Sequence, residues 1–258
     1  IDHPSMVKDG SGWGAMAGVS AALLARDGFT GAPAITIEGE DVETLWSDLG
    51  TRWTITEQYL KPYPVCRWAQ PPLEAVRQLA GEHSFEAAEI ARVEVRTFHE
   101  AFRLAMAEPN NTEEAQYSLP FPLAVYLARQ NLGPDDVSGS SLSDPEILRL
   151  SKSVVLTEDA AFSEKFPDER WAQVSLEMKD GRRLISEPAV AYGNAENPLS
   201  DDEISQKFHH LMAASNLGHL ANELEREVAE LENASSAGRL FSLLRTPLTS
   251  DAVQDAAE

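Results

Sequence analysis

Residues 61–70 read Lys-Pro-Tyr-Pro-Val-Cys-Arg-Trp-Ala-Gln, and this run restricts the fold more than any other part of the sequence. Its two prolines fix their own φ angles and drive the residues before them toward extended geometry. A helical pattern follows directly over residues 71–81, with Pro71 and Pro72 in positions that suit a first helical turn. The sequence therefore predicts a rigid, extended approach to a helix N-terminus.

The same run brings two cations, Lys61 and Arg67, to the predicted start of that helix. A helix N-terminus has backbone N–H groups without helical partners and the positive end of the helix dipole. Together with two full charges, these groups describe an anion site, most simply for a carboxylate.

The chain is strongly acidic, with 42 Asp and Glu against 21 Lys and Arg and a formal charge of −21 over 258 residues. This charge opposes long-range attraction to nucleic acid and to anionic membranes. We therefore expect no nucleic-acid and no membrane partner. An anionic ligand needs a local basic pocket, such as the one predicted at Lys61 and Arg67.

Cysteine usage and hydropathy favour a cytoplasmic protein. A single cysteine excludes an internal disulfide and a multi-cysteine zinc site, and it fits a reducing compartment. The sequence has no run of about 18 apolar residues that would predict a transmembrane helix, and no signal-peptide pattern. It has no metal-binding or nucleotide-binding motif. The chain begins at Ile1 without a methionine, which indicates a fragment or a processed chain.

Periodicity predicts a helical, then mixed, then helical organisation. Strands are expected at 90–97 and on both sides of a hairpin turn at 179–181, namely 171–178 and 183–187. A capping box at Ser200–Glu203 opens a helix that runs to residue 214. Further helices are expected at 13–25, 41–49, 116–128, 143–153, 220–231 and 237–244. The simplest geometry is a small α+β domain inserted between two parts of a helical domain.

Several stretches, in this order, resemble the MmgE/PrpD family, whose members include 2-methylcitrate dehydratase, cis-aconitate decarboxylase and iminodisuccinate epimerase. They are Ser5–Asp9 with Gly12–Gly18, Gly28–Gly31, Lys61–Trp68, Gln116–Phe121, and Asn197–Glu203 with Lys207-Phe208. Together they span most of the chain, up to about residue 245.

The resemblance implies an α+β protein in which an all-helical domain, incomplete in this chain, carries an inserted smaller α+β lid domain. It assigns residues 1–58 to the helical domain, 59–192 to the lid, 193–245 to C-terminal helices that return to the helical domain, and 246–258 to a tail. The N-terminal helical part of the family has no counterpart here. We expect a second polypeptide to carry it, because the helix at 13–25 would otherwise expose its apolar faces.

The resemblance also implies a cofactor-independent lyase or isomerase that acts on a small di- or tricarboxylate by dehydration, decarboxylation or epimerisation. Such reactions remove a proton, water or CO₂ beside a carboxylate and develop enolate charge, which fixed cations stabilise. Lys8 and Lys61 align with lysines that lie near the substrate carboxylates in the family, and a partly desolvated lysine can act as an acid or base. Both are catalytic candidates, and the plain alternative is an ordinary surface lysine. Family members generally dimerise, so a homo-oligomer or a heteromer is expected.

Four side chains are candidate substrate-binding groups. Cys66 stands where relatives have cysteine or histidine; no histidine is near it in sequence, which favours a small pocket-lining side chain over a nucleophile. Arg67 either clamps a carboxylate or pairs with one of the many acidic residues. Trp13 and Tyr63 fit the wall of a pocket, although aromatic side chains more often belong to a core.

Two positions depart from the family pattern. Gln70, a further candidate binding residue, stands where many relatives have a histidine, and glutamine cannot do acid–base work. His99, just after the strand at 90–97, is a third catalytic candidate that could replace a lost base, against the alternative of a solvated loop histidine. A non-catalytic substrate-binding or regulatory subunit that retains the lid is therefore the second hypothesis. A pure scaffold protein, the third, leaves the Lys61 run unexplained.

Overall fold

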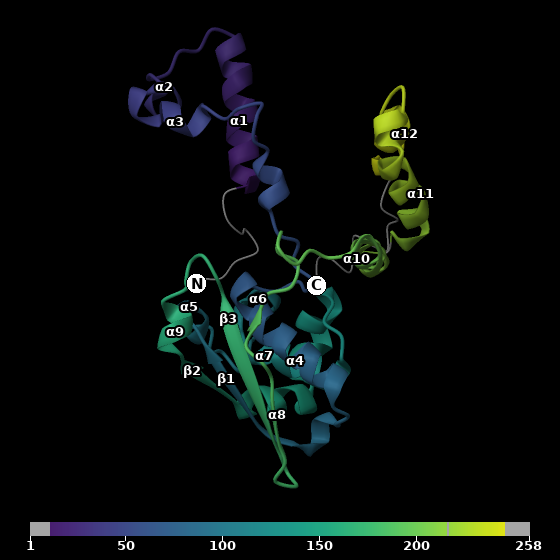
Figure 1. Cartoon of the computed structure of the whole chain (residues 1–258). Helices are drawn as coiled ribbons and strands as arrows, with labels where there is room; N and C mark the ends of the chain where they lie inside the picture. The colour runs from purple at the N-terminus through teal and green to yellow at the C-terminus, as the bar shows by residue number, and fades with distance from the viewer. Residues whose placement is uncertain (1–10, 216, 246–258) are drawn as a thin grey trace. The chain divides into compact units, whose positions relative to one another are not determined.

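The computed structural model describes residues 11–215 and 217–245 (Figure 1). The chain divides into two compact units, of which the first ends at Gln58 and the second begins at Tyr59. Each unit has its own architecture. The predicted domain boundaries at 192 and 245 stay a prediction.

The first unit is helical. Helix α1 spans Ser11–Arg26, which confirms the helix predicted at 13–25, and the short helices α2 and α3 span Ile35–Glu38 and Glu43–Trp46. The helix predicted at 41–49 is thus shorter, and a 3₁₀-helix at Glu40–Val42 precedes it. None of residues 12–58 is buried.

The second unit is built on a mixed five-stranded sheet (Figure 1). Strand β1 (Ile90–Thr97) pairs in parallel with β2 (Val154–Glu158) and antiparallel with β3 (Trp171–Met178). β3 also pairs antiparallel with β4 (Arg183–Ile185) and β5 (Ala189–Val190). The predicted strands at 90–97 and 171–178 and the hairpin are confirmed, whereas β2 and β5 were not predicted.

Alternation along the strands separates a core face from a polar face. Val93, Val95, Val174 and Leu176 are fully buried, and the outer face carries ion pairs such as that of Arg183 with Glu94. The core face is covered by α4 (Gln70–Glu82), α7 (Pro120–Arg129) and α8 (Pro145–Ser153), as Figure 1 shows. Short helices α5 (His99–Phe102), α6 (Thr112–Tyr117) and α9 (Ala160–Ser163) complete this region.

The helix predicted at 116–128 is in fact two helices, α6 and α7, with an extended residue, Ser118, between them. Pro120 has no N–H, so a continuous helix would leave the carbonyl of Gln116 without its usual partner. That carbonyl instead accepts a hydrogen bond from the backbone N–H of Cys66, at 2.8 Å. The break in the helix is therefore one of the contacts that place the Lys61–Gln70 run.

Three helices follow the sheet: α10 (Asp201–Ala214), α11 (Gly218–Ala229) and α12 (Gly238–Leu244). They confirm the helices predicted in this part of the chain. The capping box is also confirmed, because Ser200 Oγ accepts from Glu203 N at 3.3 Å while Ser200 N donates to Glu203 Oε2 at 2.8 Å. No helix within residues 11–215 and 217–245 combines the length and apolar character that a bilayer crossing requires.

The second unit is therefore an α+β structure with helices packed on one face of a mixed sheet, as the α+β prediction requires. Its identity as a lid, and the incomplete helical domain that would hold it, stay predictions.

Candidate functional site

The Lys61–Gln70 run is held by two backbone contacts from distant parts of the second unit. Leu60 N donates to the carbonyl of Gly193 at 2.9 Å. Gly193 has φ +87°, and a Cβ there would collide with the carbonyl oxygen of Leu60, so only glycine fits this approach. In the middle of the run, Cys66 N donates to the carbonyl of Gln116. Backbone hydrogen bonds alone thus tie the run to the rest of the second unit.

The helix start contributes less to an anion site than the sequence predicts. A 3₁₀-helix at Arg67–Ala69 leads into α4, and the N–H of Gln70 is already bonded to the carbonyl of Arg67. Pro71 and Pro72 follow and have no N–H to offer. The prediction of unpaired N–H groups at this end is therefore wrong in its detail, and any anion affinity must come mainly from side chains.

Lys61 is partly buried, and its Nζ donates to the carbonyl of Val65 at 3.2 Å. Lys207 of α10 lies beside it and donates from Nζ to the backbone carbonyl of Lys61 at 2.5 Å. Burial, and then the charge of Lys61, lower the pKa of Lys207. Lys152 and Lys165 pair with carboxylates, whereas among the described residues Lys61 and Lys207 have no carboxylate within ion-pair distance.

Arg67 is buried, with 7% of its surface exposed, and its contacts are neutral. It donates from Nη1 to the carbonyl of Tyr192 at 3.2 Å and from Nη2 to Asn194 Oδ1, and its guanidinium lies 4.1 Å from the ring centroid of Tyr59. Burial lowers the pKa of Arg67 to about 10. These contacts tie the run to the segment that leads to α10. Of the two roles left open for Arg67, pairing with an acidic residue does not occur within the described chain.

Arg170 is the fourth cation near the run, and sequence reasoning missed it together with Lys207. It stacks on Phe166 at 5.6 Å, its buried Nε has no hydrogen-bond partner among the described residues, and its charge contributes to the lowered pKa of Arg67. The signal for Lys207 was present in the Lys207-Phe208 pair of the family resemblance. No sequence pattern marks Arg170, because it lies in the irregular segment before β3.

Gln70 and Tyr63 face the interior. Gln70 is 2% exposed, and its Nε2 donates to the carbonyls of Tyr63 and Val65 at 3.1 and 3.3 Å, so its amide braces the run from within. The ring of Tyr63 packs edge-on against Tyr126 at 5.5 Å between centroids. Burial and the neighbouring Tyr126 raise the pKa of Tyr63 well above its ordinary value. Both side chains support the shape of the run.

Cys66 packs against the core of the second unit. Burial raises the pKa of its thiol, an effect that outweighs the opposing influence of Trp68 N–H and of the Lys61 charge. A raised pKa reduces the thiolate fraction at neutral pH. This environment favours a small, packed side chain over a nucleophile.

The remaining candidates belong to other elements or lie outside the described residues. His99 begins α5 on the exposed side of β1, where its Nδ1 lies 2.9 Å from Glu158 Oε2, and this contact lowers the pKa of Glu158. Trp13 is on α1 in the first unit, with 59% of its surface exposed. Lys8 lies outside the described residues.

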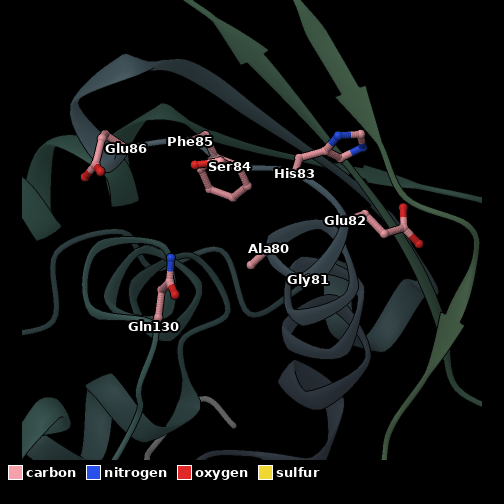
Figure 2. A pocket seen from close by; sticks show the side chains of 8 residues that line it. All are labelled: Ala80, Gly81, Glu82, His83, Ser84, Phe85, Glu86 and Gln130. Carbon is pink, nitrogen blue, oxygen red and sulfur yellow. The ribbon is translucent and has the colours of Figure 1, made fainter.

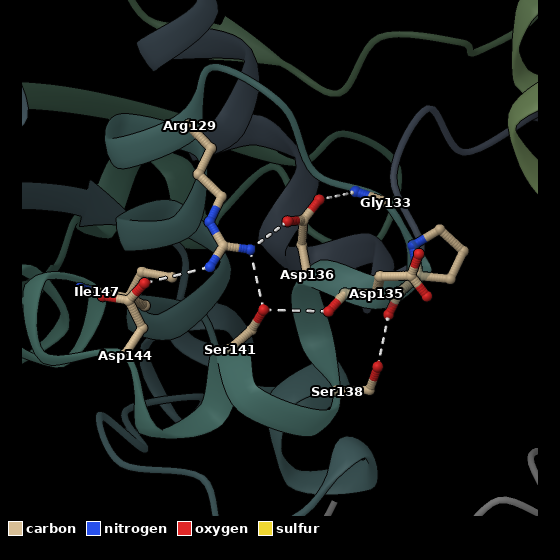
Figure 3. A network of polar contacts seen from close by, with 9 residues as sticks. Arg129, Gly133, Asp135, Asp136, Ser138, Ser141, Asp144 and Ile147 are labelled. Atoms are coloured by element: carbon tan, nitrogen blue, oxygen red, sulfur yellow. Dashed lines mark hydrogen bonds and ion pairs between the residues drawn. The ribbon is translucent and has the colours of Figure 1, made fainter. Parts of the chain in front are cut away.

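Two other features of the second unit, a surface hollow and a polar network, resemble binding sites but, within the described part of the chain, offer no unpaired cation for an anionic ligand. An open hollow of about 390 Å³ lies at the C-terminal end of α4, where His83 and Glu82 stand opposite Gln130 (Figure 2). Figure 3 shows the polar network around Arg129, whose guanidinium joins Asp136 and Asp144 and bonds to Ser141 at 2.9 Å. This arginine is neutralised by its own chain and fixes the loop after α7.

The described residues contain no group of three or more His, Cys, Asp or Glu side chains placed to hold a metal ion. The Lys61–Gln70 run is thus distinguished by the cations in it and beside it. Lys61 and Arg67 belong to the run, and Arg170 and Lys207 come from other segments. None of the four is within ion-pair distance of a carboxylate in the part of the chain described. In a chain with a net charge of −21 this is an unusual local surplus of positive charge.

Comparison with known families identifies the class of protein to which this α+β unit belongs. The model of the MmgE/PrpD C-terminal domain matches residues 63–235. The match covers more than half of the chain, which therefore belongs to the MmgE/PrpD family.

The curated relatives are distant. A cis-aconitate decarboxylase of Aspergillus terreus is 22% identical over 222 residues, which are 82% of this chain and 45% of that enzyme. A cis-aconitate decarboxylase of Mus musculus is 23% identical over 143 residues, which are 55% of this chain and 29% of that enzyme. The chain thus spans less than half the length of these relatives.

Proposed function

We propose that the chain is part of a cofactor-independent lyase or isomerase of the MmgE/PrpD type that acts on a small di- or tricarboxylate. The family assignment and the similarity to two cis-aconitate decarboxylases support a lyase-type role. The observation that carries the proposal is the Lys61 ammonium, held beside a second lysine and left without a carboxylate partner in the described chain. A substrate carboxylate is the ligand that this arrangement lacks.

The cations suit the charge change of such a reaction. When a C–H bond beside a carboxylate breaks, the proton passes to a base and the electron pair enters an enolate, whose charge Lys61 would stabilise as it forms. Loss of water or CO₂ at the same position has the same requirement. Lys8 and His99 stay proposed candidates for a second proton-transfer group, and Trp13 stays a proposed substrate-binding residue. Arg67, Tyr63, Gln70 and Cys66 are proposed to shape the floor of the pocket.

The assembled protein is proposed to include a second polypeptide, or a second copy, that covers the first unit. Exposed tryptophans at positions 13, 46 and 53 support this, because large apolar side chains are rarely left uncovered together. Native mass spectrometry of the protein from its source would show a heteromer or a homo-oligomer. A chain that is monomeric and active would exclude both.

The test of the reaction is Lys61→Met in the assembled protein, with cis-aconitate, 2-methylcitrate and iminodisuccinate as substrates. We expect kcat to fall by about a hundredfold or more, as for the loss of a group that stabilises developing charge. Lys179→Met, which removes an exposed lysine from the β3–β4 hairpin, is the matched control and should retain full activity. Unchanged rates in Lys61→Met would remove Lys61 from the active site.

A non-catalytic substrate-binding subunit is the second candidate. It is favoured by Gln70, which stands where many relatives have histidine and uses its amide on backbone carbonyls. This subunit would bind a tricarboxylate and turn over none of the panel in the assembled protein. Turnover that depends on Lys61 excludes it.

A further inference from the structure

Helix α10 brings Lys207 to the Lys61 run from 146 residues away along the chain. Its Nζ donates to the backbone carbonyl of Lys61 at 2.5 Å. The start of the helix is itself anchored, because the hydroxyl of Tyr192 donates to Glu203 Oε2 at 2.7 Å and the capping box fixes the first turn. Leu199, just before the helix, is buried. The position of Lys207 is therefore set by the fold and not by a flexible side chain alone.

The two lysines carry charges of the same sign in a partly buried place. Bringing two ammonium groups together costs free energy through repulsion and loss of water, unless an anion compensates them. The chain has 42 acidic residues, and two of them near Lys207, Glu203 of α10 and Glu225 of α11, are engaged elsewhere. Glu203 accepts from Tyr192 and Ser200, and Glu225 of α11 lies 2.9 Å from His209 Nε2. Within the described residues the fold keeps its own carboxylates away from this pair.

We propose that Lys207 is a positioning residue of the Lys61 site. It holds the backbone of Lys61 in place and supplies a second positive charge, so that the site prefers ligands with two or more carboxylates over monocarboxylates. The inference rests on the proposed function and extends it, because it assigns the selection for polycarboxylates to α10, in the C-terminal part of the chain.

A hydrogen bond to the Lys61 carbonyl could serve structure alone, and the two roles predict different results for a neutral donor. Lys207→Gln keeps an N–H donor and removes the charge, whereas Lys207→Arg keeps the charge with a different shape. If Lys207 serves structure alone, Lys207→Gln should bind ligand like the parent protein. If Lys207 supplies charge, Lys207→Arg should bind ligand better than Lys207→Gln.

The experiment measures binding of tricarballylate, an unreactive tricarboxylate, and of butyrate by isothermal titration calorimetry on the full protein. We expect Lys207→Gln to weaken tricarballylate by about tenfold, the scale of one charge-assisted contact, and to change butyrate binding little. Lys207→Arg should recover most of the loss. Lys179→Met should bind both ligands like the parent protein, and thermal melts should show that all variants fold.

In kinetic assays the same change should raise KM for a tricarboxylate more than it lowers kcat, because Lys207 acts through binding and placement. If the parent protein binds tricarballylate and Lys207→Gln binds it equally well, the inference is wrong while the proposed function stands. If the variant binds more weakly but the parent turns over no substrate, the proposed reaction is wrong and the inference stands. A parent protein that binds no tricarballylate overturns both.

Discussion

The two units of the chain differ in whether they have an interior. In the first unit, no residue between 12 and 58 is buried, although the segment is rich in large apolar side chains. In the second unit, a contiguous core joins the sheet to α4, α7 and α8. The same chemical driving force acts on both, since apolar area gains stability only when it is removed from water. The difference shows that a segment can be helical without having a core, as the first unit is in the chain on its own.

The largest expected effect is on the core of the second unit. Phe121 of α7 is fully buried, and Phe121→Ala should lower the free energy of unfolding by about 3–5 kcal/mol through lost burial and a residual cavity. The matched change in the first unit is Leu45→Ala, at a side chain that is 68% exposed; in the isolated monomer, without the proposed partner or second copy, it should stay within about 0.5 kcal/mol. Urea titrations followed by circular dichroism measure both.

A large cost for Leu45→Ala would break this comparison. It would mean that the first unit buries its apolar side chains in solution against a partner or a second copy. Repeating the titration at several protein concentrations would identify an oligomer, because its apparent stability rises with concentration.

The next largest effect on stability is expected where Gly193 approaches the carbonyl of Leu60. Gly193→Ala places a Cβ against the carbonyl of Leu60 at a positive φ and should cost about 3 kcal/mol. Gly181, in the β3–β4 hairpin, has nearly the same φ, +89°, but has open space around it. Gly181→Ala should therefore cost only about 1 kcal/mol, the backbone strain alone. Equal costs at the two glycines would show that Leu60 does not approach Gly193 in solution.

The next comparison is between a buried guanidinium group, that of Arg67, and an exposed one, that of Arg52. Arg67→Met removes two hydrogen bonds and the stacking on Tyr59 inside the second unit, and it should cost about 1.5–3 kcal/mol. Arg52 in the first unit pairs with Glu57 in full solvent, and Arg52→Met should change stability too little to resolve. Thermal melts of the two variants test this contrast. If the two changes cost the same, the buried position of Arg67 is wrong.

The sequence predicted what depends on local pattern. The strand at 90–97 and the hairpin at 179–181 follow from alternation and turn chemistry, and the helix at 71–81 follows from its apolar spacing. The strands β2 and β5 were missed because each depends on pairing with a distant partner. The break at Ser118 was missed although Pro120 is a local signal for it, and the hydrogen bond from Cys66 N that the Gln116 carbonyl accepts in its place joins residues far apart in the chain.

The candidate site shows the same limit. Lys61 was identified from its own run, and Lys207 was passed over although it stands in a stretch that resembles the family. Its importance depends on a contact between α10 and the Lys61 carbonyl, which no spacing rule predicts. Arg67 left two roles open in the sequence, and the neutral contacts around it remove acidic pairing within the described chain. Whether the four cations bind a carboxylate stays a prediction.

The smallest effect is kinetic and concerns the thiol of Cys66. Burial raises its pKa, so at pH 8 its thiolate fraction lies below that of an ordinary thiol, and its reactivity should rise only at higher pH. A matched probe is Ser47→Cys in a Cys66→Ala background, since Ser47 is exposed in the first unit. Iodoacetamide alkylation followed by mass spectrometry should show Cys66 reacting several-fold more slowly than the introduced thiol at pH 8, with the gap closing as pH rises. Equal rates at pH 8 would mean that the Lys61 charge outweighs burial at this thiol, which would return Cys66 to the list of possible nucleophiles.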